Sequence, residues 1–329
     1  MTLPNGLQVG IAVDVAAYPL DSHTSQRDFW RTLVSRLDEV VEFITLEDGF
    51  AATGGDGLDA ILLANWLAPR SRKIGIIAGA PVNYLEPFHI STAVATLDYV
   101  SEGRAGLFAQ ELRGDRALQA KEAIGALGGY PATDGPALGQ DAKDAIDVIR
   151  RLWDSWEGDA IIRDRESFRF LDGAKLHYIN FESAGFKVLG PSITPRPPQG
   201  QPVVAALQIE GNDASATADV IFIRPGNLEG INFRTRRGDP KAQAIFVDLD
   251  VDAEPASVTE FATQVARAAT SGANGVRLIV RDPKRQLDRL VNELLPALEG
   301  ASLLRKPGSG TLRERLGLPA AINRYTSAA

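Results

Sequence analysis

The chain has 329 residues, of which 44% are hydrophobic, so it can form one large domain or two ordinary ones. Its formal net charge of −7 argues against a general nucleic-acid surface, and the absence of cysteine excludes disulfides and thiolate chemistry. No apolar run approaches the ~18 residues of a membrane span, and the first residues lack the features of a secretory signal. We therefore expect a cytoplasmic protein that binds neither nucleic acid nor membrane.

Strand-like apolar runs recur along the chain and are mostly separated by segments with helical spacing, such as 26–42, 57–68 and 141–157. The runs are 7–15, 43–48, 73–82, 105–112, 202–208, 220–225, 244–251 and 275–282. Near-continuous apolar strands suit a parallel sheet buried on both faces. About eight such repeats predict a (β/α)8 TIM barrel. A doubly wound open sheet is the alternative, but no G-x-G-x-x-G follows the first run.

The segment between the fourth and fifth runs does not follow this alternation of strands and helices. Residues from about 158 to 200 are too many and too polar for one connection, so we predict an insertion between strands 4 and 5. It should carry a short hairpin near Ala184–Leu189. The tail, from about 300 to 329, carries three leucines that are expected to pack on the barrel or on a second subunit: Leu312, Leu316 and Leu318. We treat 1–329 as a single domain.

In a TIM barrel the functional residues lie at the C-terminal ends of the strands. The polar candidates at the ends of the predicted strands are Asp14, Glu47, Asp48, Gln110, Glu111, Gln208, Arg224, Asp248, Asp250, Arg281 and Asp282, with Pro81 to Tyr84 beside them. Several carboxylates can converge at this face. The pattern favours acid–base chemistry or a metal site only weakly, because surface loops are rich in Asp and Glu.

The three histidines are not spaced for a local zinc site. His23 follows the first strand and His89 begins a helix after the third, so both are candidate catalytic residues. For His89 an ordinary role in the first helical turn is the competing interpretation. His177 lies in the insertion and is expected to be structural, and Trp153 and Trp156 are expected in the core. There is no nucleophile elbow and no P-loop, so the residues alone indicate a barrel enzyme of unspecified chemistry.

The stretch 86–104, "EPFHISTAVATLDYVSEGR", resembles the "EPxHxxRxxATLDxLSxGR" block of the bacterial luciferase-like flavin-dependent monooxygenases. Three further stretches, 148–170, 175–203 and 310–325, resemble the branch with the nitrilotriacetate, pristinamycin-synthase and dibenzothiophene-sulfone monooxygenases. The matching residues of the first block are Glu86, Pro87, His89, Ala95, Thr96, Leu97, Asp98, Ser101, Gly103 and Arg104.

This resemblance implies a barrel that binds FMN at the C-terminal ends of its strands. Reduced FMN would come from a separate flavin reductase, and O2 would be the co-substrate for oxygenation of a small organic molecule. The cofactor supplies the oxygen chemistry, while the protein holds it and excludes water. The resemblance also implies a homodimer or higher oligomer. The cofactor-binding residues that it implies are Asp48, Gly79, Glu111, Gln208, Gly211 and Asn212.

The sequence departs from the family pattern at the ends of two strands. Phe108 stands where the family has an Asn, and Glu111 and Leu112 stand near its Thr-Ser pair. The phosphate-binding "AGSSxxG" has become "ALQIEGN", which includes Glu210. About a hundred residues that usually follow strand 6 or 7 are missing. Two alternatives therefore stay open: a degenerate, non-catalytic subunit or binding protein, and a deazaflavin-dependent oxidoreductase on the same barrel.

Overall fold

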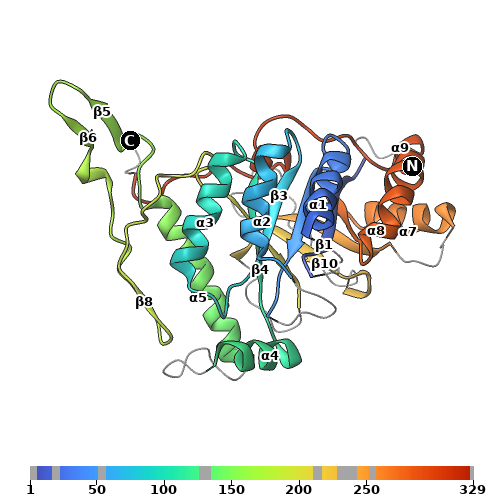
Figure 1. The fold of residues 1–329 in the computed structure, drawn as a ribbon, viewed down its shortest axis with the longest axis horizontal. Helices are drawn as coiled ribbons and strands as arrows, with labels where there is room; N and C mark the ends of the chain where they lie inside the picture. Colours follow the sequence, from blue (N-terminus) through green and yellow to red (C-terminus); the bar gives the residue numbers. More distant parts are fainter. Residues whose placement is uncertain are drawn as a thin grey trace.

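Eight parallel strands pair in a closed ring, in the order β1-β12-β11-β10-β9-β4-β3-β2 (Figure 1). The computed structural model describes residues 6–16, 23–50, 57–125, 135–209, 217–227, 243–251 and 257–326. The barrel strands are β1 (Gln8–Asp14), β2 (Phe43–Glu47), β3 (Gly75–Pro81), β4 (Ala105–Gln110), β9 (Val203–Leu207), β10 (Val220–Ile223), β11 (Ala244–Asp250) and β12 (Gly275–Ile279). The predicted (β/α)8 barrel is confirmed, and the open-sheet alternative is wrong.

Helices cover the outside of this ring (Figure 1). They are α1 (His23–Leu37), α2 (Ala60–Leu67), α3 (Pro87–Val100), α4 (Gly114–Ile124), α5 (Gly135–Asp154), α7 (Val258–Thr270), α8 (Pro283–Arg289), α9 (Leu295–Gly300) and α10 (Leu312–Arg315). Shorter turns are η1 (Ala68–Arg70), η2 (Gly173–Lys175), η3 (Pro225–Asn227) and η4 (Leu290–Leu294). Within the described ranges, no helix combines the length and apolar character needed to cross a membrane.

Helix α3 shows how the local sequence sets its own ends. Pro87 occupies the first turn, where its fixed φ suits a helix and its missing N–H is not needed. The Glu86 carboxylate accepts hydrogen bonds from the N–H groups of Phe88 (3.0 Å) and His89 (2.9 Å). At the other end, Gly103 has φ +81° and donates its N–H to the Asp98 carbonyl. These caps deliver the chain directly into β4.

Aromatic rings fill the barrel interior because glycines leave them room. A Cβ on Gly10 would lie 2.2 Å from the Phe43 ring, and one on Gly275 would lie 2.3 Å from the Phe246 ring. The rings of Phe43 and Phe246 meet edge to face with centroids 5.0 Å apart, and Phe222 lies 6.1 Å from Phe43. The barrel is therefore a packed core rather than a pore.

The C-terminal tail closes the N-terminal end of the barrel. Leu312, Leu316 and Leu318 are buried in the same cluster as the interior phenylalanines. Arg315 donates from Nη1 to the Lys73 carbonyl (2.7 Å) and forms a buried ion pair with Glu42 (3.2 Å). The prediction that the tail packs on the barrel is confirmed. Because one end is closed, a ligand site in the barrel is confined to the opposite end.

The insertion forms two hairpins at the side of the molecule next to α3 and α5 (Figure 1). The hairpin of β7 (Phe181–Glu182) and β8 (Lys187–Val188) confirms the one predicted near 184–189. A second hairpin, of β5 (Ile161–Asp164) and β6 (Arg169–Leu171), was not predicted. Its two strands, IIRD and RFL, are short and do not alternate between apolar and polar residues, so no period-2 pattern marks them.

The aromatic residues around the insertion have the structural roles expected of them. Trp153 and Trp156 are buried, and their indole N–H groups donate to the carbonyls of Ser91 (2.9 Å) and Ser192 (2.8 Å). His177 stacks on a tail residue, with its ring centroid 4.6 Å from that of Tyr325. The Trp153 contact joins α5 to α3, while the Trp156 and His177 contacts fasten the insertion to the end of α5 and to the tail.

Candidate functional site

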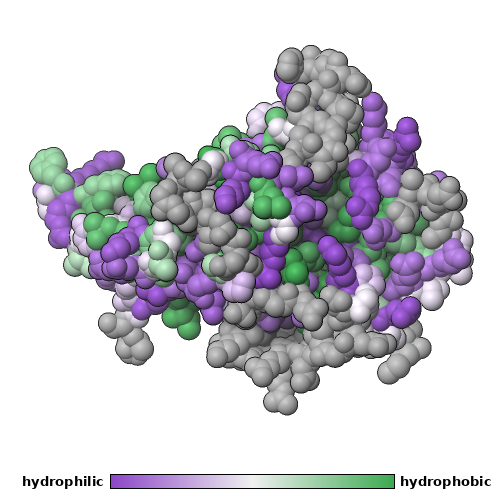
Figure 2. Space-filling model, turned by 90° about the horizontal axis from the view of Figure 1, so that it is seen from below, coloured by the Kyte–Doolittle hydropathy of each residue, from purple (hydrophilic) through white to green (hydrophobic). Residues whose placement is uncertain are grey.

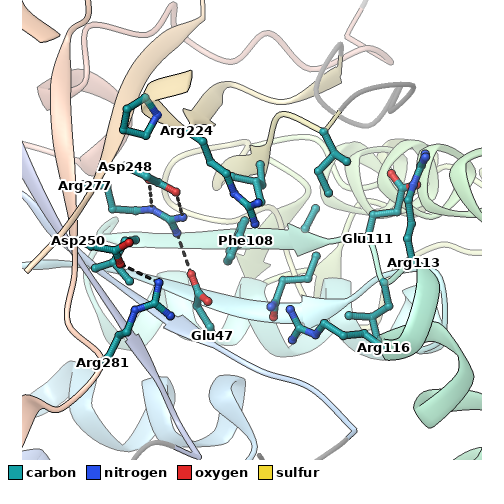
Figure 3. Close-up of a pocket in the computed structure, with 17 residues that line it drawn as sticks. Glu47, Phe108, Glu111, Arg113, Arg116, Arg224, Asp248, Asp250, Arg277 and Arg281 are labelled. Carbon is teal, nitrogen blue, oxygen red and sulfur yellow. Dashed lines mark hydrogen bonds and ion pairs between the residues drawn. The ribbon is translucent and has the colours of Figure 1, made fainter. Parts of the chain in front are cut away.

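A cavity of about 550 Å³ opens at the C-terminal ends of the barrel strands. Its volume lies within the range of small-molecule sites. It is lined by Glu47, Phe108, Ala109, Gln110, Glu111, Leu112, Arg113, Arg116, Leu207, Ile209, Arg224, Pro225, Asp248, Asp250, Arg277, Ile279 and Arg281. Figure 2 shows the molecule from below, with hydrophilic and hydrophobic residues interspersed on this face, and Figure 3 shows the lining side chains.

Arg277 forms the centre of the cavity floor. It lies on β12, and its guanidinium binds both carboxylate oxygens of Asp248 on β11, at 2.8 and 2.7 Å. Its Nη1 also donates to Glu47 on β2 at 3.1 Å (Figure 3). Burial alone would lower the pKa of Arg277, but the two carboxylates outweigh it and raise the pKa above its usual value. The Arg277 guanidinium therefore stays protonated across the physiological pH range.

Two aromatic rings flank this guanidinium. Its central carbon lies 3.7 Å from the ring centroid of Phe222 and 5.1 Å from that of Phe108, which are distances of cation–π contact. Phe108 is only 4% exposed, because its ring packs edge to face on Phe222 at 5.4 Å. Phe108 therefore belongs to the floor, and the cavity lies above it. It supplies a ring surface in place of the amide that the family resemblance implied.

The walls of the cavity carry two further charge pairs. Arg281 donates to Asp250 at 2.8 Å. Arg113 is paired with Glu111, whose side chain is almost fully buried. Glu111, a predicted cofactor-binding residue, thus lies in the cavity wall with its negative charge compensated by Arg113. Of the carboxylates that sequence reasoning placed at this face, Glu47, Glu111, Asp248 and Asp250 converge here, each beside an arginine, whereas Asp14, Asp48 and Asp282 do not line this cavity.

Two arginines of the lining are not neutralised in this way. Arg116 on α4 donates to the Asp48 carbonyl at 3.1 Å, and Arg224 follows β10. Neither forms an ion pair with a residue in the described part of the chain. Both guanidinium groups point toward the middle of the cavity (Figure 3). Guanidinium groups bind carboxylates and phosphates through paired hydrogen bonds, so the mouth is suited to an anionic ligand.

Gly79, a second predicted cofactor-binding residue, makes space for a neighbouring side chain. A Cβ at Gly79 would lie 2.4 Å from Oε1 of Gln110. Gln110 accepts from the N–H of Asp48 at 2.9 Å and donates to its carbonyl at 3.0 Å. The small residue on β3 therefore lets a β4 amide fix the end of β2. In this structure the side chain of Gln110 fills the space beside Gly79.

The Asp48 carboxylate, also predicted to bind the cofactor, caps the following loop. It accepts hydrogen bonds from the N–H groups of Gly49 (2.6 Å) and Ala60 (2.9 Å). Burial raises the pKa of Asp48, and the negative charges of Asp59 and Asp14 add to that effect. The residue therefore shapes the rim next to the main cavity rather than its floor.

Asp48 lines a second cavity of about 570 Å³, which lies beside the first. The two share Leu112 and Arg116 in their linings. The second cavity is lined by Asp14, Val15, Ala16, Asp48, Gly49, Phe50, Gly57, Leu58, Asp59, Pro81, Leu85, Leu112, Arg116 and Gln119. The barrel mouth therefore offers two adjoining compartments with Arg116 between them.

The other predicted site residues lie outside both compartments or outside the described ranges. Gln208 donates its backbone N–H to the Phe222 carbonyl at 2.8 Å but does not line either cavity. Gly211 and Asn212 fall outside the described residues, as does Glu210. Within the described ranges, no group of three His, Asp or Glu side chains is arranged to hold a metal ion.

Of the two candidate histidines, only His89 has a side chain in the described part of the structure. His23 is the first residue of α1, and its side chain lies outside the described part of the structure. His89 is exposed on the first turn of α3 and lines neither compartment. The competing interpretation of His89, a first-turn residue bonded to the loop, agrees with its hydrogen bond to Glu86.

Sequence reasoning missed the central residue of the floor. Arg277 lies inside the apolar run "GVRLI", where a single charge reads as an interruption. Alternation along the strand places it on the same side as Gly275 and Ile279, which is the barrel interior. This alternation along the strand was the signal in the sequence that could have identified Arg277 as an inward-facing residue. Arg113 and Arg116 were missed because they lie beyond the end of β4, Arg113 at the N-cap of α4 and Arg116 within that helix.

The family was established by comparison with known proteins. A profile of the luciferase-like monooxygenases matches residues 40–248. This chain belongs to the luciferase-like monooxygenase family. The matched range runs from the start of β2 to the inward-facing Asp248 of β11, and it includes most of the residues that line the cavity.

The curated relatives to which this chain is similar are named as monooxygenases. The chain is 37% identical over 172 residues to N-acetyl-S-(2-succino)cysteine monooxygenase of Bacillus subtilis (strain 168), which covers 51% of this chain and 37% of that protein. It is 34% identical over 168 residues to nitrilotriacetate monooxygenase component A of Aminobacter aminovorans, which covers 50% of this chain and 36% of that protein. The matched part thus spans well under half of these relatives.

Solved structures agree on the fold. DmoA from Hyphomicrobium sulfonivorans superposes with a TM-score of 0.74 at 16% identity, covering 95% of this chain and 92% of that one. A riboflavin lyase crystallised with modified FMN and riboflavin gives a TM-score of 0.71 at 18% identity, covering 95% and 96%. At such identities the likeness concerns the barrel and not its chemistry.

Proposed function

We propose that this protein is an FMN-dependent monooxygenase. It would take reduced FMN from a separate flavin reductase and use O2 to oxygenate a small organic substrate. The observation that carries the proposal is the cavity at the barrel mouth, into which Arg116 and Arg224 direct guanidinium groups that no described carboxylate neutralises. Membership of the luciferase-like monooxygenase family supports the reaction class.

The cavity fits this cofactor by its size and by its donors. A space of about 550 Å³ is in the range that holds ligands of nucleotide size. The ring surface of Phe108 and the side chains of Leu207 and Ile279 offer an apolar bed for a flat heteroaromatic ring. Arg224 and Arg116 would hold the phosphate group, because each guanidinium can donate two parallel hydrogen bonds to it.

The remaining charges keep the floor compatible with an anion. Asp248 and Glu47 would repel a phosphate and a reduced flavin if Arg277 did not bind both. Arg113 does the same for Glu111 in the wall. When bound, reduced FMN would supply the electrons that activate O2, and the apolar side chains of Phe108, Leu207 and Ile279 would keep water from the reacting ring. The neighbouring compartment lined by Leu85 and Phe50 is the proposed place for the organic substrate.

A non-catalytic role in the same family is the second candidate. The observation that favours it is Phe108, which offers no hydrogen-bond donor where the family resemblance implies an amide. A subunit of this kind would keep the barrel without binding flavin tightly. The deazaflavin alternative shares the same cavity and differs only in the cofactor that it accepts. Flavin titration separates the three.

The test is an anaerobic titration of the purified protein with FMN, reduced FMN and a deazaflavin cofactor, followed by fluorescence and calorimetry. Reduced FMN binding at about micromolar concentration supports the monooxygenase. O2 consumption is then measured with an added flavin reductase and NADH. Binding of the deazaflavin alone would replace the proposal with the deazaflavin oxidoreductase, and binding of none of the three would support the non-catalytic subunit.

The matched variants are Arg224→Gln and Arg72→Gln. Arg224 follows β10 at the mouth, whereas Arg72 is exposed just before β3, at the closed end of the barrel. Both changes remove one positive charge, so a loss of reduced FMN binding in Arg224→Gln alone locates the phosphate at the cavity. Equal behaviour of the two variants would refute this placement.

A further inference from the structure

The two compartments at the barrel mouth differ in the balance of their charges. The lining of the first contains four carboxylates and five arginines, so its positive charges are in excess. The lining of the second contains the carboxylates of Asp14, Asp48 and Asp59 and a single cation, Arg116. Arg116 belongs to both linings, and it lies at their junction. The two adjoining cavities therefore favour ligands of opposite charge.

The protein does not neutralise the carboxylates of the second compartment. Oδ1 of Asp14 accepts from the N–H of Ala16 at 2.8 Å, and Oδ1 of Asp59 accepts from the N–H of Leu62 at 2.8 Å. Within the described ranges, none of the three aspartates forms an ion pair. The segments next along the chain, 17–22 and 51–56, contain no Lys or Arg. Negative charge therefore remains available to a bound cation.

The three carboxylates are close enough to repel one another. Burial raises the pKa of Asp48, and the charges of Asp59 and Asp14 raise it further, against the lowering effect of two backbone N–H groups. They do not form a metal site, because no group of three His, Asp or Glu side chains in the described ranges is arranged around one ion. An organic cation, whose charge is spread over a larger group, suits carboxylates placed apart in this way.

Apolar side chains form the rest of the second compartment, which has a volume of about 570 Å³. Its lining includes Val15, Phe50, Leu58 and Leu85. Leu58 is 37% exposed although it is a large apolar residue, so a ligand in the compartment would cover it. Phe50 packs edge to face on Tyr84, with ring centroids 6.0 Å apart. The compartment thus combines a surface for an apolar body with negative charge for a cationic group.

We propose that the second compartment binds an organic cation, and that the substrate of this protein is a compound with an apolar body and a protonated amine. The ammonium group would lie among Asp14, Asp48 and Asp59, with the apolar body against Phe50 and Leu85. A carboxylate of the same shape would be rejected, because it would meet three negative charges. The assignment as substrate rests on the proposed function, whereas binding of the cation does not.

The first test is calorimetric titration of the full chain at neutral pH with phenethylamine, phenethyl alcohol and phenylacetate. These probes share an aromatic body and differ in the charge of the end group. The amine is protonated at this pH because alkylamines titrate near about 10. We expect wild type to bind phenethylamine at least about tenfold more tightly than phenethyl alcohol, and phenylacetate most weakly. Equal affinities, or tighter binding of the alcohol or of phenylacetate, would overturn the proposal.

The second test locates the cation with Asp14→Asn and Asp59→Asn. Each change removes one negative charge and keeps a side-chain oxygen that accepts the same backbone N–H. We expect the affinity for phenethylamine to fall about fivefold in each variant, and the affinity for the alcohol to stay the same. The control is Asp282→Asn, because Asp282 also caps a helix, α8, but lines neither compartment. Aspartate variants that bind like wild type, or an equal loss in the control, would refute the placement.

A parallel titration with reduced FMN separates this inference from the proposed function. If reduced FMN does not bind while the amine preference holds, the proposed function fails and the cation site stands. If reduced FMN binds and the amine preference is absent, the cation site fails alone. With reductase and NADH present, phenethylamine should raise O2 consumption more than the other two probes do. Any other order would overturn the substrate class and leave the cation site.

Discussion

The two ends of this barrel use the same residue type for opposite purposes. At the closed end, Arg313 donates to the carbonyls of Gln201 (2.8 Å) and Pro319 (3.1 Å) and binds Asp219 (2.9 Å), so all its nitrogens are used within the protein. At the mouth, Arg116 and Arg224 point into a cavity. Arginine is a structural cross-link where the chain encloses it, and a ligand-binding group where the chain leaves it open.

This difference indicates that residues that stabilise the fold and residues that bind a ligand lie at different ends of the barrel. The closed end is sealed by buried leucines and by arginines whose carbonyl and carboxylate partners all belong to the protein. The mouth is held by ion pairs around Arg277, with space above them. Substitutions at the closed end should therefore change stability alone. At the mouth, substitutions in the floor should lower stability, whereas those in the rim should lower the affinity for the ligand.

The largest expected effect is at the floor. Arg277→Met leaves Asp248 and Glu47 without their buried cation, so we expect the free energy of unfolding to fall by about 4 kcal/mol. Urea unfolding followed by circular dichroism measures it. Arg281→Met is the control, because the Arg281–Asp250 pair is exposed and should contribute less than about 1 kcal/mol. Equal losses in the two variants would mean that the floor is no more structural than the rim.

The next effect tests the closed end. Leu312 is fully buried against Gly75, and Leu312→Ala should lower the free energy of unfolding by about 3 kcal/mol through lost packing and a residual cavity. The affinity for reduced FMN should stay the same, because the change lies at the opposite end from the mouth. If the affinity fell together with the stability, the two ends would not be independent.

A third prediction concerns Asp98, which joins α3 to the closed end. Burial raises the pKa of Asp98 to about 6, despite the hydrogen bonds it accepts from Gln199. The unfolded pKa is near 3.9, so the native state binds the proton more tightly, and stability falls as pH rises from about 4 to about 6. Relative to Asp98→Asn, wild type should lose about 2 to 3 kcal/mol over this interval. Thermal unfolding at several pH values measures it, and a constant difference would contradict the raised pKa.

The smallest expected change in free energy is at the rim. Arg224→Gln should leave stability within about 0.5 kcal/mol of wild type, because Arg224 is exposed and makes no ion pair in the described part of the chain. Its affinity for reduced FMN should fall about tenfold through loss of a phosphate donor, which corresponds to about 1.4 kcal/mol. Isothermal titration provides the measurement. A variant that is unstable but binds normally would reverse the assignment of floor and rim.

Much of the fold followed from the sequence because its signals are local. The eight apolar runs, the Pro87 start and the Gly103 end of α3, and the hairpin near 184–189 each depend on neighbouring residues. The β5–β6 hairpin escaped prediction because it has no apolar alternation. It gains its position from the contacts at its base rather than from its own pattern.

The candidate site was predictable only in part. Strand-end logic placed Glu47, Asp248 and Arg224 at one face, and the structure brings them to one cavity. It did not show that the Gln110 side chain fills the space beside Gly79, or that the Asp48 carboxylate caps a loop. Both contacts depend on the register of neighbouring strands. In the sequence, Phe108 was a departure from the family's Asn, and only the structure showed that its ring lies in the floor of the cavity.

By itself, the sequence determined a parallel (β/α)8 barrel, because apolar period and capping residues act over a few positions. Its resemblance to the luciferase-like monooxygenases came from motif residues such as those of 86–104. Only the tertiary structure decided which arginines are enclosed and which remain available to a ligand. That choice depends on carboxylates and carbonyls far away in the chain, such as Glu47 and Asp248 around Arg277, which closure of the barrel brings within hydrogen-bonding distance.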